Sequence, residues 1–127
     1  MRILMVSLEE EIFAIDIKKI KLIREIVNIT RVPSAPGYIK GIMDSAGNII
    51  TVIDMKFLLD IDNKNSEKNI VIFNAEKEKV GIAVDKALEV LEVDEDKIEV
   101  YEGNKFLYGI AEVKEKKVFI INTDNII

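Results

Sequence analysis

The chain has 127 residues, 49% of them apolar, a formal net charge of −5, and neither cysteine nor histidine. A domain of this length can bury a sizeable core. The missing residue types exclude disulfides, thiol catalysis, histidine-dependent triads and histidine metal sites. The acidic balance disfavours contact with nucleic acid and with anionic membrane surfaces. No apolar run is long enough to span a membrane and no secretory signal is visible, so we expect a soluble, cytoplasmic protein.

Short strands are expected along the whole chain. Isoleucine and valine, which favour pleated, half-buried surfaces, occupy 35 positions (23 Ile and 12 Val). The segments predicted as strands are residues 2–8, 12–15, 38–43, 49–53, 70–73, 80–84, 87–93, 98–101, 106–113 and 118–121. Residues 17–23 fit either a helical turn or a strand, and residues 23–29 are expected to run extended. About ten short, evenly spaced strands are typical of a sandwich or of barrels.

Turn residues separate these segments. Pro33 and Pro36 predict a loop, because proline cannot donate to a strand ladder. Residues 44–48 (DSAGN) predict a hairpin with Gly47 in the left-handed region. Two charged runs predict further turns, at residues 76–79 and 114–117.

Two more features concern how the segments are joined. Asp54 stands before residues 55–59, where an N-cap residue accepts a backbone N–H of a helical turn. Residues 60–69 (DIDNKNSEKN) are the most polar stretch, which we interpret as a linker between two halves.

Glycine inside a strand often marks a bulge or a sharp bend of a small barrel. Gly-Ile pairs occur at or near strand starts, at Gly41, Gly81 and Gly109.

Carboxylates are the groups whose clustering could support chemistry. Residues 9–11 (EEE) and 94–96 (DED) offer the oxygen ligands that hard cations prefer, but such runs are usually solvated turns. Paired carboxylates also hydrolyse glycosides, yet no pocket is indicated. No serine has a G-x-S-x-G or S-x-x-K setting, and the six glycines form no phosphate loop. We therefore expect a non-catalytic binding domain with no metal and no cofactor.

An apolar stretch in the first half has two interpretations. Ile20, Leu22, Ile23 and Ile26 follow one another with few polar breaks. Branched aliphatic residues are mostly buried, which favours a place in the core. The alternative is an exposed apolar patch that docks a partner.

Several segments resemble CheW-like domains. Residues 31–42 (RVPSAPGYIKGI) resemble that family's R-[IV]-P-x-A-P-x-[FY]-[IV]-K-G-[IV], which is the most specific match. Residues 47–54 (GNIITVID) are similar to its G-x-I-[IV]-P-V-[IV]-D, and residues 80–85 (VGIAVD) to its [VL]-G-[IL]-x-V-D. Residues 13–17 (FAIDI) resemble its [FY]-G-I-x-I, and the resemblance extends from residue 3 to residue 127.

The resemblance implies an all-β fold of two intertwined five-stranded SH3-like β-barrels with short helical turns, in a single domain over residues 1–127. It also implies a non-catalytic adaptor that couples membrane chemoreceptors to the histidine kinase CheA. Family members pair with the regulatory domain of that kinase through apolar barrel surfaces. The cytoplasmic tip of the receptor docks near the groove between the barrels. Such an adaptor is recruited to membrane receptor arrays without entering the membrane.

Three positions depart from the family's pattern. Leu22 and Ala46 stand where the family usually has Glu and Arg, two charges that can pair across the first barrel. Losing both is physically coherent, because either charge alone and partly buried would be costly. Thr51 replaces a proline and restores a backbone N–H to its strand. A divergent adaptor for a kinase or receptor outside chemotaxis is therefore the alternative function.

The predicted partner-binding residues lie around these departures. They are Ile20, Leu22, Arg24, Gly41, Ala46 and Gly47. Arg24 has a second interpretation as a solvated surface charge, since exposed ion pairs contribute little.

A carboxylate-dependent enzyme or metal binder remains a further hypothesis. A nucleic-acid-binding small barrel is another, but the net charge and the presence of only eight aromatic residues (five Phe, three Tyr) argue against it.

Overall fold

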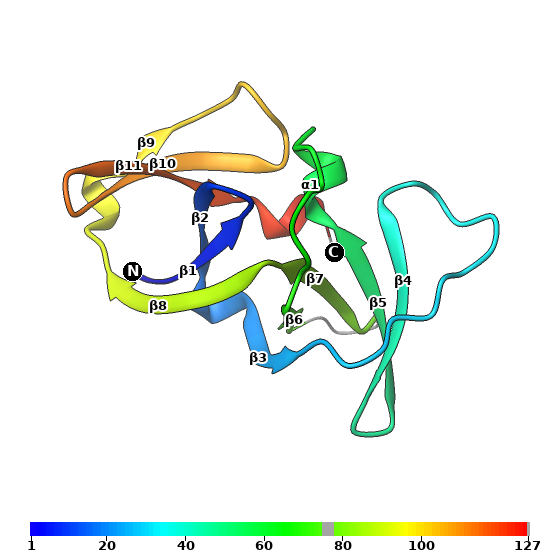
Figure 1. Ribbon diagram of the computed structural model, residues 1–127. Helices are drawn as coiled ribbons and strands as arrows, with labels where there is room; N and C mark the ends of the chain where they lie inside the picture. The colour runs from blue at the N-terminus through cyan, green and yellow to red at the C-terminus, as the bar shows by residue number, and fades with distance from the viewer. Residues whose placement is uncertain (75–77, 127) are drawn as a thin grey trace.

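The structure is a computed structural model that describes residues 1–74 and 78–126, and most of these residues lie in two β-sheets (Figure 1). Six strands form the first sheet: β1 (Arg2–Leu8), β2 (Glu11–Asp16), β8 (Lys86–Glu92), β9 (Glu99–Val100), β10 (Leu107–Val113) and β11 (Lys116–Ile121). Five strands form the second: β3 (Ile20–Glu25), β4 (Ile39–Ser45), β5 (Asn48–Asp54), β6 (Asn69–Phe73) and β7 (Val80–Val84). One helical turn, α1 (Met55–Leu58), follows β5, and 3-10 turns occupy Ile17–Lys19, Glu95–Lys97 and Thr123–Asn125. We call the six-stranded sheet with its turns the first lobe and the five-stranded sheet with its turns the second lobe.

The two sheets share one pattern of strand order. They read β8-β1-β2-β11-β10-β9 and β3-β6-β7-β5-β4. Each contains a hairpin, β1–β2 or β6–β7, with an antiparallel neighbour on one side and a parallel neighbour on the other. After each hairpin the chain crosses into the opposite sheet, so the lobes are intertwined. The all-β fold of two SH3-like barrels is confirmed, and the two-residue strand β9 makes one sheet six-stranded.

The chain passes between the lobes at other positions than the polar segment that was predicted as the linker. The polar residues 60–68 join α1 to β6, two elements of the second lobe, so the prediction of a linker between halves is wrong at this point. The chain crosses instead at the 3-10 turn Ile17–Lys19 and at Asp85, between β7 and β8. Both crossings are short, because a long connection is not needed between lobes that pack directly on each other.

The other local predictions are mostly confirmed. Residues 17–23 form a 3-10 turn followed by the start of β3, which ends at Glu25 and not at residue 29. Gly41 and Gly109 lie at register shifts of their ladders, as the bulge prediction requires. Gly81 pairs regularly with Ile72, where an added Cβ would come within 2.9 Å of Ile70. The predicted turn over residues 76–79 lies partly outside the described residues.

The core explains why the strands read as continuous apolar runs. Alternate residues of one strand enter different clusters, because successive side chains point to opposite faces. On β1, Leu4 and Val6 join a cluster shared by both lobes, whereas Ile3 and Met5 join a cluster of the first lobe. Ile70 and Ile72 of β6 likewise belong to a cluster of the second lobe. Within residues 1–74 and 78–126, no helix is long and apolar enough to cross a membrane.

Candidate functional site

Three of the predicted site residues line one small groove of the second lobe, which we call the β3 groove. β3 provides Leu22 and Arg24, and the turn between β4 and β5 provides Ala46. The groove has a volume of about 150 Å³, and its lining includes Lys21, Leu22, Arg24, Ala46, Ile72 and Lys79. The structure thus brings together the two positions at which the family usually has opposite charges. An apolar side chain and a methyl group line the groove there instead.

The turn that carries Ala46 depends on left-handed backbone. Ala46 has φ 51° and Gly47 has φ 84°. The Gly47 N–H donates to the Asp44 carboxylate at 3.0 Å. A Cβ on Gly47 would meet nothing within 4 Å, so the need for glycine comes from the backbone alone. The hairpin predicted at this place is confirmed.

Ile20 and Gly41 do not line the β3 groove. Ile20 is half-buried and packs against the cluster shared by the lobes. Gly41 is buried with φ 155°, and a Cβ there would lie 2.3 Å from the carbonyl oxygen of Thr30. Any influence of Gly41 on a partner would therefore act through the path of β4 and of the loop before it.

A second groove opens between the lobes, where the family resemblance implied one, but none of its lining residues was predicted from the sequence. The second lobe contributes Tyr38, Ile53, Phe57 and Leu58, and the first lobe contributes Lys105, Phe106, Asn125 and Ile126. This interlobe groove has a volume of about 510 Å³. Phe57 is 59% exposed and Tyr38 is 41% exposed, so the lining of the groove presents two large aromatic side chains to solvent.

Gly37 makes room for the most exposed of these aromatic rings. A Cβ on Gly37 would come within 2.9 Å of the Phe57 ring. The Asp54 carboxylate accepts the Phe57 N–H at 3.1 Å, so the predicted N-cap of α1 is confirmed. The ring is thus presented by a capped helical turn on one side and by a glycine on the other.

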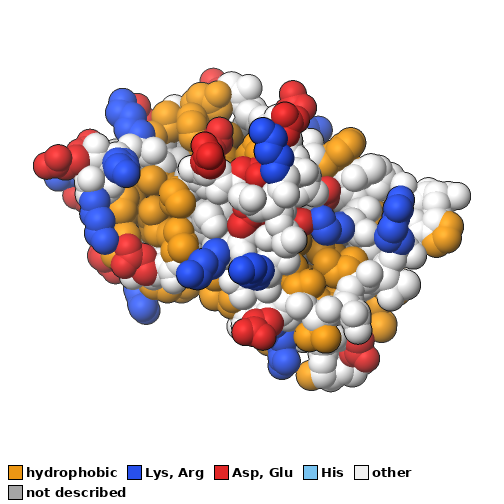
Figure 2. All heavy atoms as spheres, in the orientation of Figure 1, with side chains coloured by type: hydrophobic (Ala, Val, Ile, Leu, Met, Phe, Trp, Pro, Cys, Tyr) orange, Lys and Arg blue, Asp and Glu red, His pale blue; other side chains and the backbone are white. Residues whose placement is uncertain are grey.

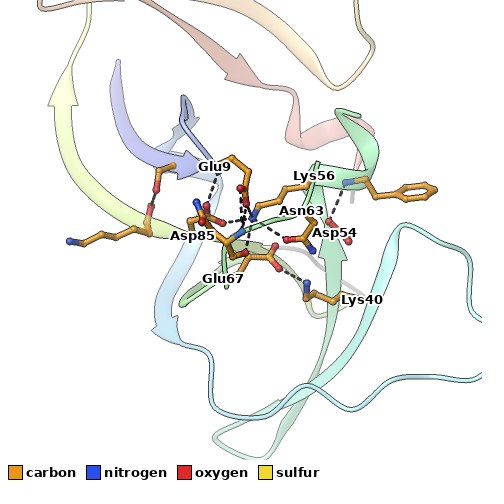
Figure 3. Close-up of polar contacts among 11 residues, drawn as sticks. Glu9, Lys40, Asp54, Lys56, Asn63, Glu67 and Asp85 are labelled. Atoms are coloured by element: carbon orange, nitrogen blue, oxygen red, sulfur yellow. Dashed lines mark hydrogen bonds and ion pairs between the residues drawn. The ribbon is translucent and has the colours of Figure 1, made fainter. Parts of the chain in front are cut away.

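A buried lysine links the two lobes at their junction (Figure 3). Lys56 of α1 is 0% exposed, and its Nζ lies 2.6 Å from an Asp85 carboxylate oxygen. The same ammonium group donates to Glu9, which lies in the turn between β1 and β2 of the first lobe. It also donates to Asn63 at 3.3 Å and to the carbonyl oxygen of Asn65 at 3.1 Å. We call Lys56, Glu9 and Asp85 the junction cluster.

The carboxylates of the junction cluster also bind backbone. Asp85 accepts the Glu9 N–H at 2.7 Å, and Glu9 accepts the Asn65 N–H at 2.9 Å. The hydrogen bond from Lys56 is the main reason that the pKa of Glu9 lies below its usual 4.5. Burial lowers the pKa of Lys56, but its bonds to Asp85 and Glu9 outweigh burial and raise that pKa above 10.5. Glu9 and Lys56 are therefore both charged at neutral pH.

A second ion pair lies beside the junction cluster. Lys40 of β4 pairs with Glu67, whose side chain is only 3% exposed. Burial raises the pKa of Glu67 above 4.5, although Lys40 opposes this shift. The pair ties β4 to the loop before β6.

Charged and apolar side chains are interleaved on the face of the molecule shown in Figure 2. Apolar side chains gather there over the region where Figure 1 draws β8 and β10. Leu88 and Val90 of β8 are 43% and 40% exposed. Among the residues that the structure describes, no three histidine, cysteine or acidic side chains are placed to hold a metal ion.

Comparison with known proteins agrees with this architecture. A crystal structure of the scaffolding protein TtCheW from Thermoanaerobacter tengcongensis is 34% identical, with a TM-score of 0.87 over 95% of this chain and 83% of that one. The chemotaxis protein CheW of Thermotoga maritima is 25% identical over 98% of this chain and 86% of its own length. The chemotaxis protein CheW of Bacillus subtilis is 33% identical over 68% of this chain and 57% of its own length. A family model described as a CheW-like domain matches residues 2–127, and the chain therefore belongs to the CheW-like family.

Proposed function

We propose that this protein is a non-catalytic adaptor that couples chemoreceptors to the histidine kinase CheA at membrane receptor arrays. The observation that carries the proposal is the 34% identity and TM-score of 0.87 to a CheW scaffolding protein over 95% of the chain. A scaffold needs separate surfaces for its partners, and the β3 groove and the interlobe groove share no lining residue.

The interlobe groove suits the tip of a receptor's helical hairpin. Amphipathic helices dock by laying apolar side chains into an apolar groove. Phe57 and Tyr38 offer exposed aromatic area, and aromatic residues are enriched among the residues that dominate binding energy. The cationic Lys105 lies at the same groove, over the Phe106 ring.

A divergent adaptor for another signalling kinase is the second candidate. The observation that favours it is the β3 groove, where Leu22 and Ala46 replace the charges usual in the family. Kinase and receptor fragments from chemotaxis would then fail to bind, while a kinase from another pathway would bind.

The experiment is a titration of the protein with a receptor-tip fragment from its own organism. Substituting Phe57→Ala removes an exposed aromatic anchor, and truncating such an anchor costs about 2 kcal/mol, roughly thirty-fold in Kd. We expect that weakening for Phe57→Ala. The matched control is Ile49→Ala on β5, which removes a side chain of similar exposure (58% against 59%) outside the groove and should leave the Kd within about three-fold. Equal effects of the two substitutions, or no binding by the wild type, would contradict the proposal.

A further inference from the structure

The β3 groove has a local charge opposite to that of the whole chain. Lys21, Arg24 and Lys79 line it, although the net charge of the protein is −5. None of these three cations forms an ion pair with a carboxylate of residues 1–74 or 78–126. Lys79 lowers the pKa of Lys21 below 10.5, as a hydrogen-bond partner and as a like charge. Lys21 and Lys79 both line the groove, so two like charges lie along it, and an anion there would relieve their repulsion.

Part of the lining of the same groove is apolar. Leu22, Ala46, Ile50 and Ile72 line it beside the polar Ser45 and Asn48, and Ile50 and Ile72 are each only 2% exposed. An apolar cavity of roughly 150 Å³ can hold a molecule of benzene. A groove of about 150 Å³ is therefore large enough for one branched or aromatic side chain.

We propose that the β3 groove binds an acidic segment of a protein partner. One apolar side chain of the segment enters the groove, and carboxylates on either side of it pair with Lys21, Arg24 and Lys79. The inference rests on the proposed adaptor function, because it assumes that this face of the second lobe contacts another protein. The carboxylates come from the partner, because the described residues that line the groove include no acidic side chain.

Charge complementarity of this kind selects the partner more than it adds affinity. Exposed ion pairs contribute little one by one, but an apolar side chain that fills the groove removes water from around them. A partner with basic residues at the same place would be rejected by like-charge repulsion. Pairing with the carboxylates of another protein thus favours acidic partners over basic ones.

The test is a peptide titration of the whole chain, followed by the backbone amide spectrum in low-salt buffer. The first probe is an acetylated, amidated pentapeptide with leucine between two pairs of glutamates. The second has glycine in place of leucine, and the third has lysines in place of glutamates. We expect saturable shifts at Leu22, Ala46 and Ile72 with the first probe, and binding at least about ten-fold weaker with the other two.

A charge-reversed variant and a matched control complete the test. The double substitution Lys21→Glu with Lys79→Glu should weaken the first probe at least about ten-fold. Lys116→Glu with Lys117→Glu on β11 makes the same change of charge at exposed positions of the first lobe and should change binding less than about two-fold. The amide spectrum of each variant shows whether it is folded.

Several outcomes would overturn the inference. They are an absence of shifts, shifts spread over the surface, equal losses in both double variants, and the same shifts caused by inorganic phosphate at the same concentration. The last result would identify a small-anion site. Failure here leaves the receptor-tip titration unaffected, so it can be told apart from failure of the adaptor function.

Discussion

Lys56 is the side chain on which polar contacts from both lobes converge. Its ammonium group meets Glu9 from the β1–β2 turn and Asp85 from a crossing between the lobes. A buried ion pair stabilises a protein little more than well-packed apolar residues would in its place. Removing one partner alone is costly, because it leaves the other buried charge unpaired. The junction cluster therefore makes the packing of the two lobes sensitive to this one residue.

Substituting Lys56→Met should destabilise the protein by about 3–5 kcal/mol at pH 7, because Glu9 and Asp85 stay behind without their cation. Urea unfolding measures the change. The control is Lys18→Met, at an exposed lysine outside the cluster, which should cost less than about 0.5 kcal/mol.

The stability lost in Lys56→Met should also become smaller as the pH falls. The native pKa of Glu9 lies below 4.5, so its contribution is present above pH 4.5 and disappears as the pH falls through the lowered native value. The difference between wild type and Lys56→Met should therefore be largest at neutral pH and shrink in acid. A difference that grows in acid would contradict this assignment.

Sequence reasoning singled out three residues that line the β3 groove, but it gave no sign of the junction cluster. Leu22 and Ala46 stood out because they depart from a family pattern, and they do line one groove. Lys56 gave no signal, because Glu9 lies 47 residues away in the sequence and periodicity reports only neighbours. Phe57 was missed for a similar reason, since its groove forms only when residues from both lobes meet.

At the scale of elements, local signals predicted the hairpins, the bulges at Gly41 and Gly109 and the N-cap at Asp54. These features depend on backbone conformation within a few residues, which the sequence determines directly. Polarity misplaced the connection between the halves, because it reports exposure and not which elements a segment joins. Residues 60–68 are polar yet connect two elements of one sheet.

The cap on α1 gives a prediction at this scale. Asp54→Ala removes the acceptor of the Phe57 N–H and should cost about 1 kcal/mol, whereas Asp54→Asn keeps an acceptor and should cost a few tenths. Thermal or urea unfolding of the two variants measures the difference. If Asn and Ala cost the same, the charge of Asp54 and not its cap would be the source of stability.

At the scale of the whole molecule, the intertwined topology explains how a small chain can form two separate grooves. Each hairpin is completed by strands from the other half of the chain, and the shared cluster holds the lobes together. The interlobe groove exists only because this packing is fixed. The β3 groove belongs to one lobe, so occupancy of one groove need not disturb the other.

The most direct measurement is a calorimetric titration of the protein with the CheA regulatory domain from its own organism, without and with a saturating receptor-tip fragment. The adaptor account predicts a Kd of about 1 µM or tighter for the kinase domain. It also predicts that the receptor fragment changes this Kd by less than about three-fold, because the two partners use separate surfaces. No binding by a well-folded sample, or competition between the two partners, would contradict the account.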